Sequence, residues 1–113
     1  MSTRCNVLIK NQREQTHVLY CHWDGYPKCV GVQLEKFFKY CNDSVVTSVD
    51  ACARFINDMN SSYEMNMCIA PDIDYLYTID IDNRTIQCER VAVRGEKTLV
   101  YLAQFGEEVA SQY

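Results

Sequence analysis

Residues 75–93, YLYTIDIDNRTIQCERVAV, decide the fold because they hold two alternating apolar runs on either side of a turn sequence. The turn is Asp82-Asn83-Arg84, and the alternation of apolar and polar side chains before it is typical of a half-buried strand. The pattern therefore predicts an antiparallel β-hairpin. Apolar side chains change parity after Cys88, which predicts a β-bulge near Glu89 and Arg90 and not a slipped register.

A second hairpin is predicted at the start of the sequence, where residues 5–10 and 16–23 both have extended, β-rich patterns. A turn near residues 12–13 pairs Val7 with Val18. The same register places Arg4 beside Cys21 or His22.

The segments between and after the hairpins predict helices and one more strand. Apolar positions three to four apart predict an amphipathic helix over 28–41 and a second helix over 47–59, and 63–74 is interpreted as a long loop with a possible short strand at 67–69. Residues 98–105 predict a last strand, although their leucine spacing also fits a short helix. We therefore expect an α+β fold over residues 1–113: a single antiparallel sheet of about five strands with two helices packed on one face, in the order ββααβββ.

Composition narrows the function classes. A chain of 113 residues is the size of one domain, and a net charge of −4 does not favour a surface for phosphate backbones, so no direct nucleic acid binding is expected. No run is apolar enough for a membrane helix and the first residues do not resemble a signal peptide, so we expect a cytoplasmic protein away from the membrane. The seven cysteines contain no C-x-x-C pair, which favours reduced, buried thiols with no metal or cofactor; a metal site at Cys21, His22 and Cys29 is the weaker alternative.

Residues 22–27, HWDGYP, are the densest set of functional side chains and stand where a strand passes into a helix. Amides that open a helix attract anions, so an anion is expected above Lys28 and Cys29, with close backbone approach at Gly31. The predicted ligand-binding residues are Arg4, His22, Trp23, Asp24, Gly25, Tyr26, Lys28 and Gly31. The competing interpretation is a structural brace, in which Asp24 accepts amide hydrogen bonds and pairs with Arg4.

The same residues resemble a known family. Thr3-Arg4 is followed by Tyr20-x-His22-x-Asp24-Gly25-Tyr26-Pro27 and then by Gly31 and Leu34. This order is similar to the T-R…Y-x-H-x-D-G-Y-P…G-x-x-L motif of small phage and prophage proteins, most of which have no assigned function. The resemblance covers residues 3–38, with a weaker match at 74–79. It implies a viral origin and not a mechanism, and Lys28 departs from it because the family often has an acidic residue there.

Three functions follow as expectations. The first is a phage-type accessory protein that binds and occludes a host defence protein, as anti-CRISPR proteins do, through the carboxylates Asp72, Asp74, Asp80 and Asp82. The second is a sponge that binds a small nucleotide signal at residues 22–27, where aromatic rings beside cations suit a base and a phosphate. The third is a small hydrolase or thiol enzyme that uses His22 and Cys29. The late strand also predicts a possible homodimer.

Overall fold

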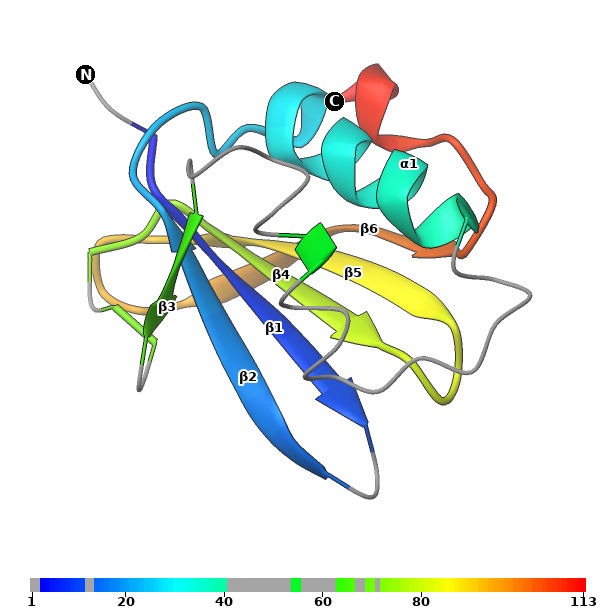
Figure 1. Ribbon diagram of the computed structural model, residues 1–113. Helices are drawn as coiled ribbons and strands as arrows, with labels where there is room; N and C mark the ends of the chain where they lie inside the picture. Colours follow the sequence, from blue (N-terminus) through cyan, green and yellow to red (C-terminus); the bar gives the residue numbers. More distant parts are fainter. Residues whose placement is uncertain (1–2, 12–13, 41–53, 56–62, 67–68, 71) are drawn as a thin grey trace.

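A computed structural model describes residues 3–11, 14–40, 54–55, 63–66, 69–70 and 72–113 (Figure 1). Its strands form one six-stranded sheet with the order β3-β2-β1-β4-β5-β6. Figure 1 shows the helical segments on one face of this sheet, as the alternation of buried side chains along the strands requires. The α+β class is therefore confirmed, and the details of the sheet differ from the prediction.

The central hairpin is confirmed. Strand β4 (Tyr75–Asp80) pairs antiparallel with β5 (Thr85–Val91), and β6 (Lys97–Gln104) follows antiparallel to β5. The predicted bulge near Glu89 and Arg90 is wrong for β5, which pairs with β4 without interruption as far as Arg90. The register between β5 and β6 does shift between Cys88 and Glu89. The extra residue is Val100 of β6, since Cys88 faces Tyr101 and Glu89 faces Leu99. Residues 97–104 are a strand, so the alternative of a short helix there is wrong.

The first hairpin is present with its register shifted by one residue. Strand β1 (Cys5–Asn11) pairs with β2 (Glu14–Cys21), and Val7 faces Leu19 where the sequence predicted Val18. A register shift between Ile9 and Asn11 causes the difference: two residues of β2 stand opposite one residue of β1 at that point.

The sheet is mixed, so the prediction of a purely antiparallel sheet is wrong. Strand β1 pairs in parallel with β4, and Cys5 faces Tyr75 at the start of both strands. A parallel neighbour requires the chain to cross over the sheet between the two strands, and the helical segment after β2 lies on that path. The two hairpins are thereby joined side by side through β1 and β4.

The predicted order ββααβββ is also wrong. A short π-helical segment, η1 (Pro27–Gly31), continues into α1 (Val32–Tyr40), as expected from Pro27 at the first helical position. Strand β3 (Tyr63–Asn66) stands where a loop was predicted, because four residues added to the edge of β2 are too few for a recognisable period. The predicted helix over 47–59 lies outside the described residues, apart from the helical Arg54 and Phe55, and most of 67–69 does as well.

The core lies between the sheet and the helical layer. Leu34 and Phe38 of α1 pack with the buried faces of the central strands, where Val7, Tyr77 and Ile79 are fully buried. The final 3-10 turn, η2 (Ala110–Gln112), packs on η1 and α1. Among the described residues, no helix has the length and apolar character needed to cross a membrane.

Candidate functional site

The HWDGYP turn is held to the sheet from two sides at Gly25. The Gly25 N–H donates to the Thr3 carbonyl at 2.9 Å, and the Tyr77 hydroxyl donates to the Gly25 carbonyl at 2.8 Å. A Cβ at this position would lie 2.9 Å from the Thr3 oxygen, so only glycine fits. The left-handed backbone conformation of the turn belongs to Asp24, with φ of 57°, and not to the glycine. Gly25 therefore acts as a structural brace.

Gly31 has a packing role as well. A Cβ on Gly31 would lie 2.6 Å from the Tyr101 hydroxyl and 2.8 Å from the Ala110 Cβ. The space beside Gly31 is thus filled by β6 and η2. Because Gly31 has no side chain, η1 packs closely on the sheet.

Two of the amides near the predicted anion site have backbone partners. The amides of Cys29 and Val30 both donate to the Tyr26 carbonyl at 2.9 Å, so they are bonded within the helical segment. Lys28 follows Pro27, which has no N–H to offer.

His22 and Trp23 form an aromatic pair on the surface. The His22 Nδ1 and the Tyr20 hydroxyl are hydrogen-bonded at 2.8 Å, and the His22 and Trp23 rings meet edge to face with centroids 4.8 Å apart. Trp23 is 66% exposed. Among the described residues, His22 lines neither of the two pockets that are described next.

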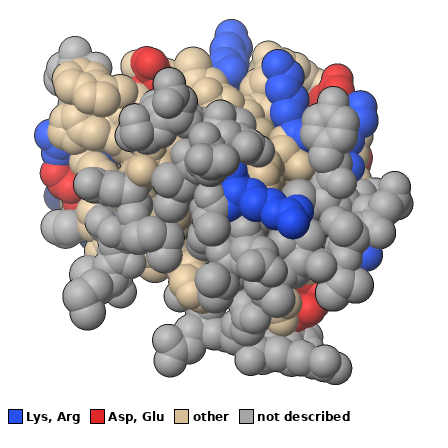
Figure 2. Space-filling view, in the orientation of Figure 1, with Lys and Arg blue, Asp and Glu red and all other residues tan. Residues whose placement is uncertain are grey.

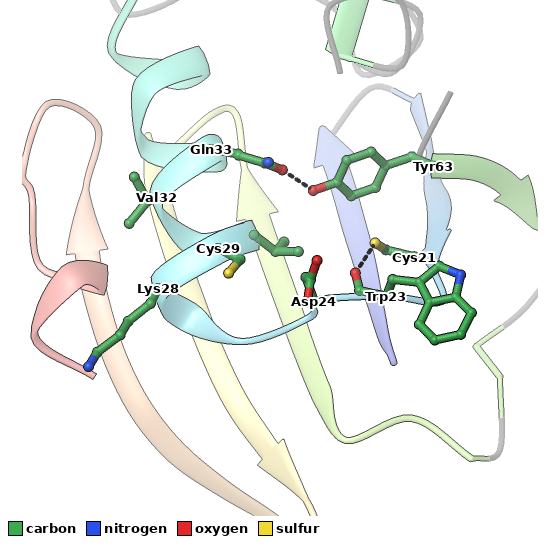
Figure 3. A pocket seen from close by; sticks show the side chains of 9 residues that line it. Cys21, Trp23, Asp24, Lys28, Cys29, Val32, Gln33 and Tyr63 are labelled. Carbon is green, nitrogen blue, oxygen red and sulfur yellow. Dashed lines mark hydrogen bonds between the residues drawn. The ribbon is translucent and has the colours of Figure 1, made fainter. Parts of the chain in front are cut away.

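One pocket lies beside the turn and we call it the turn pocket. Its volume is about 410 Å³, and it is lined by Cys21, Trp23, Asp24, Lys28, Cys29, Val30, Val32, Gln33 and Tyr63. Figure 3 shows Lys28 and Trp23 on opposite sides of the view, with the Lys28 ammonium pointing away from the other side chains. The Tyr63 hydroxyl donates to Gln33 Oε1 across the pocket.

A second pocket, which we call the arginine pocket, opens beside the start of β1 and β4. Its volume is about 370 Å³, and it is lined by Thr3, Arg4, Tyr26, Asp72, Asp74, Tyr75 and Arg90. The Arg4 guanidinium pairs with Asp72, and the Arg4 N–H donates to Asp74 Oδ2 at 3.1 Å. The expected pairing of Arg4 with Asp24 is thus replaced by Asp72. Among the described residues, Arg90 has no ion-pair partner, and the Arg4 Nε is buried without a hydrogen-bond partner.

The predicted site is therefore divided. Arg4 and Tyr26 share the arginine pocket, whereas Trp23, Asp24 and Lys28 line the turn pocket. Sequence reasoning missed Arg90 and the role of Tyr75. A hairpin register centred on the turn at 82–84 was available as a signal, because it places Tyr75 directly opposite Arg90.

The predicted acidic partner-binding residues lie in two groups at the two ends of β4. Asp72 and Asp74 precede β4, whereas Asp80 ends it and Asp82 lies in the turn that follows. A six-residue strand is about 17 Å long, so the two pairs are separated by that distance. In Figure 2, basic and acidic side chains are interspersed with uncharged ones over the described part of the face shown.

Asp80 is occupied by local structure. Partial desolvation raises the pKa of Asp80, but hydrogen bonds from Asn83 and the charge of Lys10 outweigh it and lower the pKa below its usual value. The Asn83 N–H and Nδ2 donate to Asp80 at 3.1 and 2.8 Å, which fixes the turn of the β4–β5 hairpin.

The arrangement of His22 and Cys29 gives no support to the thiol-enzyme hypothesis. Cys29 lines the turn pocket, whereas His22 is bonded to Tyr20 and lies outside that lining. Within the described ranges, no three His, Cys, Asp or Glu side chains come together as metal ligands. Comparison with family models, curated proteins and solved structures gives no match for this chain. The resemblance of residues 3–38 to the phage family therefore stays a prediction.

Proposed function

We propose that this protein is a non-catalytic binding protein that sequesters a small phosphorylated ligand with a planar ring, such as a nucleotide signal, in the arginine pocket. The observation that supports it is the lining of that pocket, which combines two guanidinium groups with two tyrosine rings. A guanidinium group can donate two parallel hydrogen bonds to the oxygens of a phosphate group, and aromatic rings stack on nucleotide bases. A volume of about 370 Å³ lies in the range of small-molecule sites.

The two arginines have different roles in this proposal. Arg90 is exposed and has no ion-pair partner within the described residues, so it is available to a phosphate group. Arg4 is held by Asp72, whose side chain is 58% exposed and can leave when an anion replaces it. Tyr26 is 45% exposed and stands at the pocket, where it can stack on a ring. In a phage accessory protein, such a site would remove a host signal from solution.

The test is isothermal titration calorimetry with a panel of mononucleotides, cyclic dinucleotides and ADP-ribose derivatives. Arg90→Gln is expected to weaken binding of the retained nucleotide at least tenfold, because a hydrogen bond to a charged group contributes about 1.5–3 kcal/mol. Arg94→Gln, which makes the same charge change in the exposed turn after β5, is the matched control and should bind normally. Asp72→Asn frees Arg4 and should strengthen binding.

If the Arg90→Gln and Arg94→Gln variants bind the nucleotide with equal affinity, the ligand binds outside the arginine pocket. If no nucleotide of the panel binds, the proposal is refuted. The direction of the Asp72→Asn effect is a separate check on the role of Arg4. Weaker binding in that variant would mean that the carboxylate itself contacts the ligand.

Occlusion of a host defence protein is the second candidate, and one observation favours it. Strand β6 is an edge of the sheet, and Leu99 and Leu102 on it are 57% and 59% exposed. An edge strand with exposed apolar side chains can pair with a strand of another protein. Pull-down from host lysate with the wild-type chain and with Leu99→Lys tests this candidate: a host protein retained by the first and lost by the second supports it.

A further inference from the structure

Two cysteines stand directly opposite each other on neighbouring strands of the sheet. Cys5 begins β1 and Cys21 ends β2, and the two are cross-strand partners in the antiparallel register. Both side chains are buried, with 0% and 3% exposure. Opposite Cα atoms in antiparallel sheets are about 4.5 or 5.5 Å apart, and both spacings fall within the range that a disulfide spans.

Of these two cysteines, only Cys21 lines a pocket that opens to solvent. Cys21 lines the turn pocket, and Figure 3 shows its sulfur bonded to the Trp23 carbonyl, with a distance of 2.9 Å. Cys5 is fully buried and does not line the pocket. A small reagent that enters the turn pocket therefore meets Cys21 first, with Cys5 next to it.

The environment favours the thiolate form of Cys21. A hydrogen bond from Cys5 outweighs desolvation and lowers the pKa of Cys21 to about 7, while the same hydrogen bond and burial raise the pKa of Cys5. The thiolate is the form that attacks an oxidant. The accessible cysteine is thus the reactive one, and the buried cysteine keeps its proton.

We propose that Cys5 and Cys21 form a redox-reactive dithiol, which a peroxide entering the turn pocket oxidises to a cross-strand disulfide. In the first step, the Cys21 sulfur attacks one peroxide oxygen, the O–O bond breaks, and the products are a sulfenic acid on Cys21 and one water molecule. In the second step, the Cys5 sulfur attacks the Cys21 sulfur, the S–O bond breaks, and a second water molecule leaves. Two thiols and one hydrogen peroxide thereby give one disulfide and two water molecules.

The disulfide changes the start of the HWDGYP turn. An oxidised Cys21 has no S–H, so its hydrogen bond to the Trp23 carbonyl is lost, and Trp23 is the exposed aromatic residue of the turn pocket. Cytosolic disulfides are commonly transient and redox-sensing, which is compatible with a pair that lies in a reduced protein. This site is distinct from the arginine pocket and does not depend on the function proposed for it.

The experiment is peptide mapping of the full chain after treatment with hydrogen peroxide and alkylation of the remaining thiols. Trypsin places Cys5 in the peptide 5–10, Cys21 in 14–28 and Cys29 in 29–36, so each of these thiols is read separately. We expect a dominant product in which 5–10 and 14–28 are joined and the protein is lighter by two hydrogen atoms. Dithiothreitol should restore the starting mass.

Two variants and one control sharpen the result. Cys29 lines the same pocket, so Cys29→Ala should leave the cross-link unchanged, whereas Cys5→Ala should let a sulfenic acid accumulate on Cys21, detected with dimedone. The same oxidation in concentrated urea should scatter the cross-links among many cysteines, which keeps the test informative if Cys5→Ala does not fold. A dominant cross-link to any other cysteine in the folded chain, or a folded chain that forms none, overturns the proposal.

Discussion

The packing of Gly31 against Tyr101 makes a quantitative prediction. Gly31→Ala introduces a methyl group 2.6 Å from the Tyr101 hydroxyl and 2.8 Å from the Ala110 Cβ, both closer than van der Waals contact. Overpacking costs about 1–3 kcal/mol, and the better helix propensity of alanine returns about 1 kcal/mol. Because both contacts would be too short, we expect Gly31→Ala to lower the free energy of unfolding by about 1–2 kcal/mol, which is the upper part of the difference between these two effects.

The partner variant acts in the opposite direction. The Tyr101 side chain is 5% exposed, and its hydroxyl has no hydrogen-bond partner among the described residues. Tyr101→Phe removes this unsatisfied group and should stabilise the fold by about 1 kcal/mol. It also removes the closer of the two contacts with a methyl group at position 31. The double variant should therefore be more stable than the sum of the single effects by about 0.5–1 kcal/mol.

Urea denaturation followed by circular dichroism measures the free energy of unfolding of the four proteins, with the m-value as a check that the unfolded surface stays the same. Gly95→Ala is the control. Gly95 has φ of 88°, and a methyl group added there would meet no atom within 4 Å, so the cost of the substitution is backbone strain alone. Its effect should add to that of Tyr101→Phe. If Gly31→Ala also adds without coupling, the packing argument is refuted.

Three further predictions concern the brace, the C-terminal turn and the hairpin. Tyr77→Phe leaves the Gly25 carbonyl without its donor and should lower the free energy of unfolding by about 1–3 kcal/mol in urea denaturation; an unchanged value would contradict the brace. Glu35→Leu leaves the two amides that begin η2 without an acceptor and should cost about 1–3 kcal/mol in the same assay, while Glu96→Leu, an exposed control, should cost little. Since the folded pKa of Asp80 is lowered, its contribution is present above the unfolded value near 4 and is lost as the pH falls through the folded value, so Asp80→Asn should flatten the stability profile in that acidic range; a profile parallel to wild type would contradict it.

The local elements of this fold are predictable from sequence because their signals are local. The alternation in residues 75–91, the turn at 82–84 and the proline at the start of the helical segment each specify structure within a few neighbours. The parallel pairing of β1 with β4 has no such signal, since it joins residues 70 apart in the sequence. This pairing depends on which edge of the first hairpin contacts the second hairpin, and the packing of the whole sheet determines that contact.

The predicted ligand-binding residues between 22 and 27 do not all line one pocket. The positive φ at Asp24 turns the chain between Trp23 and Tyr26, so their side chains line different pockets. Adjacency in a motif therefore does not place these two rings on one ligand. What the motif does specify is the fit of Gly25 between Thr3 and Tyr77.

The arginine pocket depends on the parallel pairing of β1 with β4, which the sequence does not reveal. The Asp74 N–H donates to the Arg4 carbonyl at 2.9 Å, and this bond places the segment before β4 beside the segment before β1. Arg4 and Asp72 meet only because of that parallel pairing, and Arg90 joins them from the strand opposite Tyr75. A pocket assembled from three separate segments cannot be recognised from a short motif, and its residue Arg90 makes no contact with the Gly25 brace. If the proposed binding function is correct, it is separable from the stability of the turn, so Arg90→Gln should change binding alone and Tyr77→Phe should change stability alone.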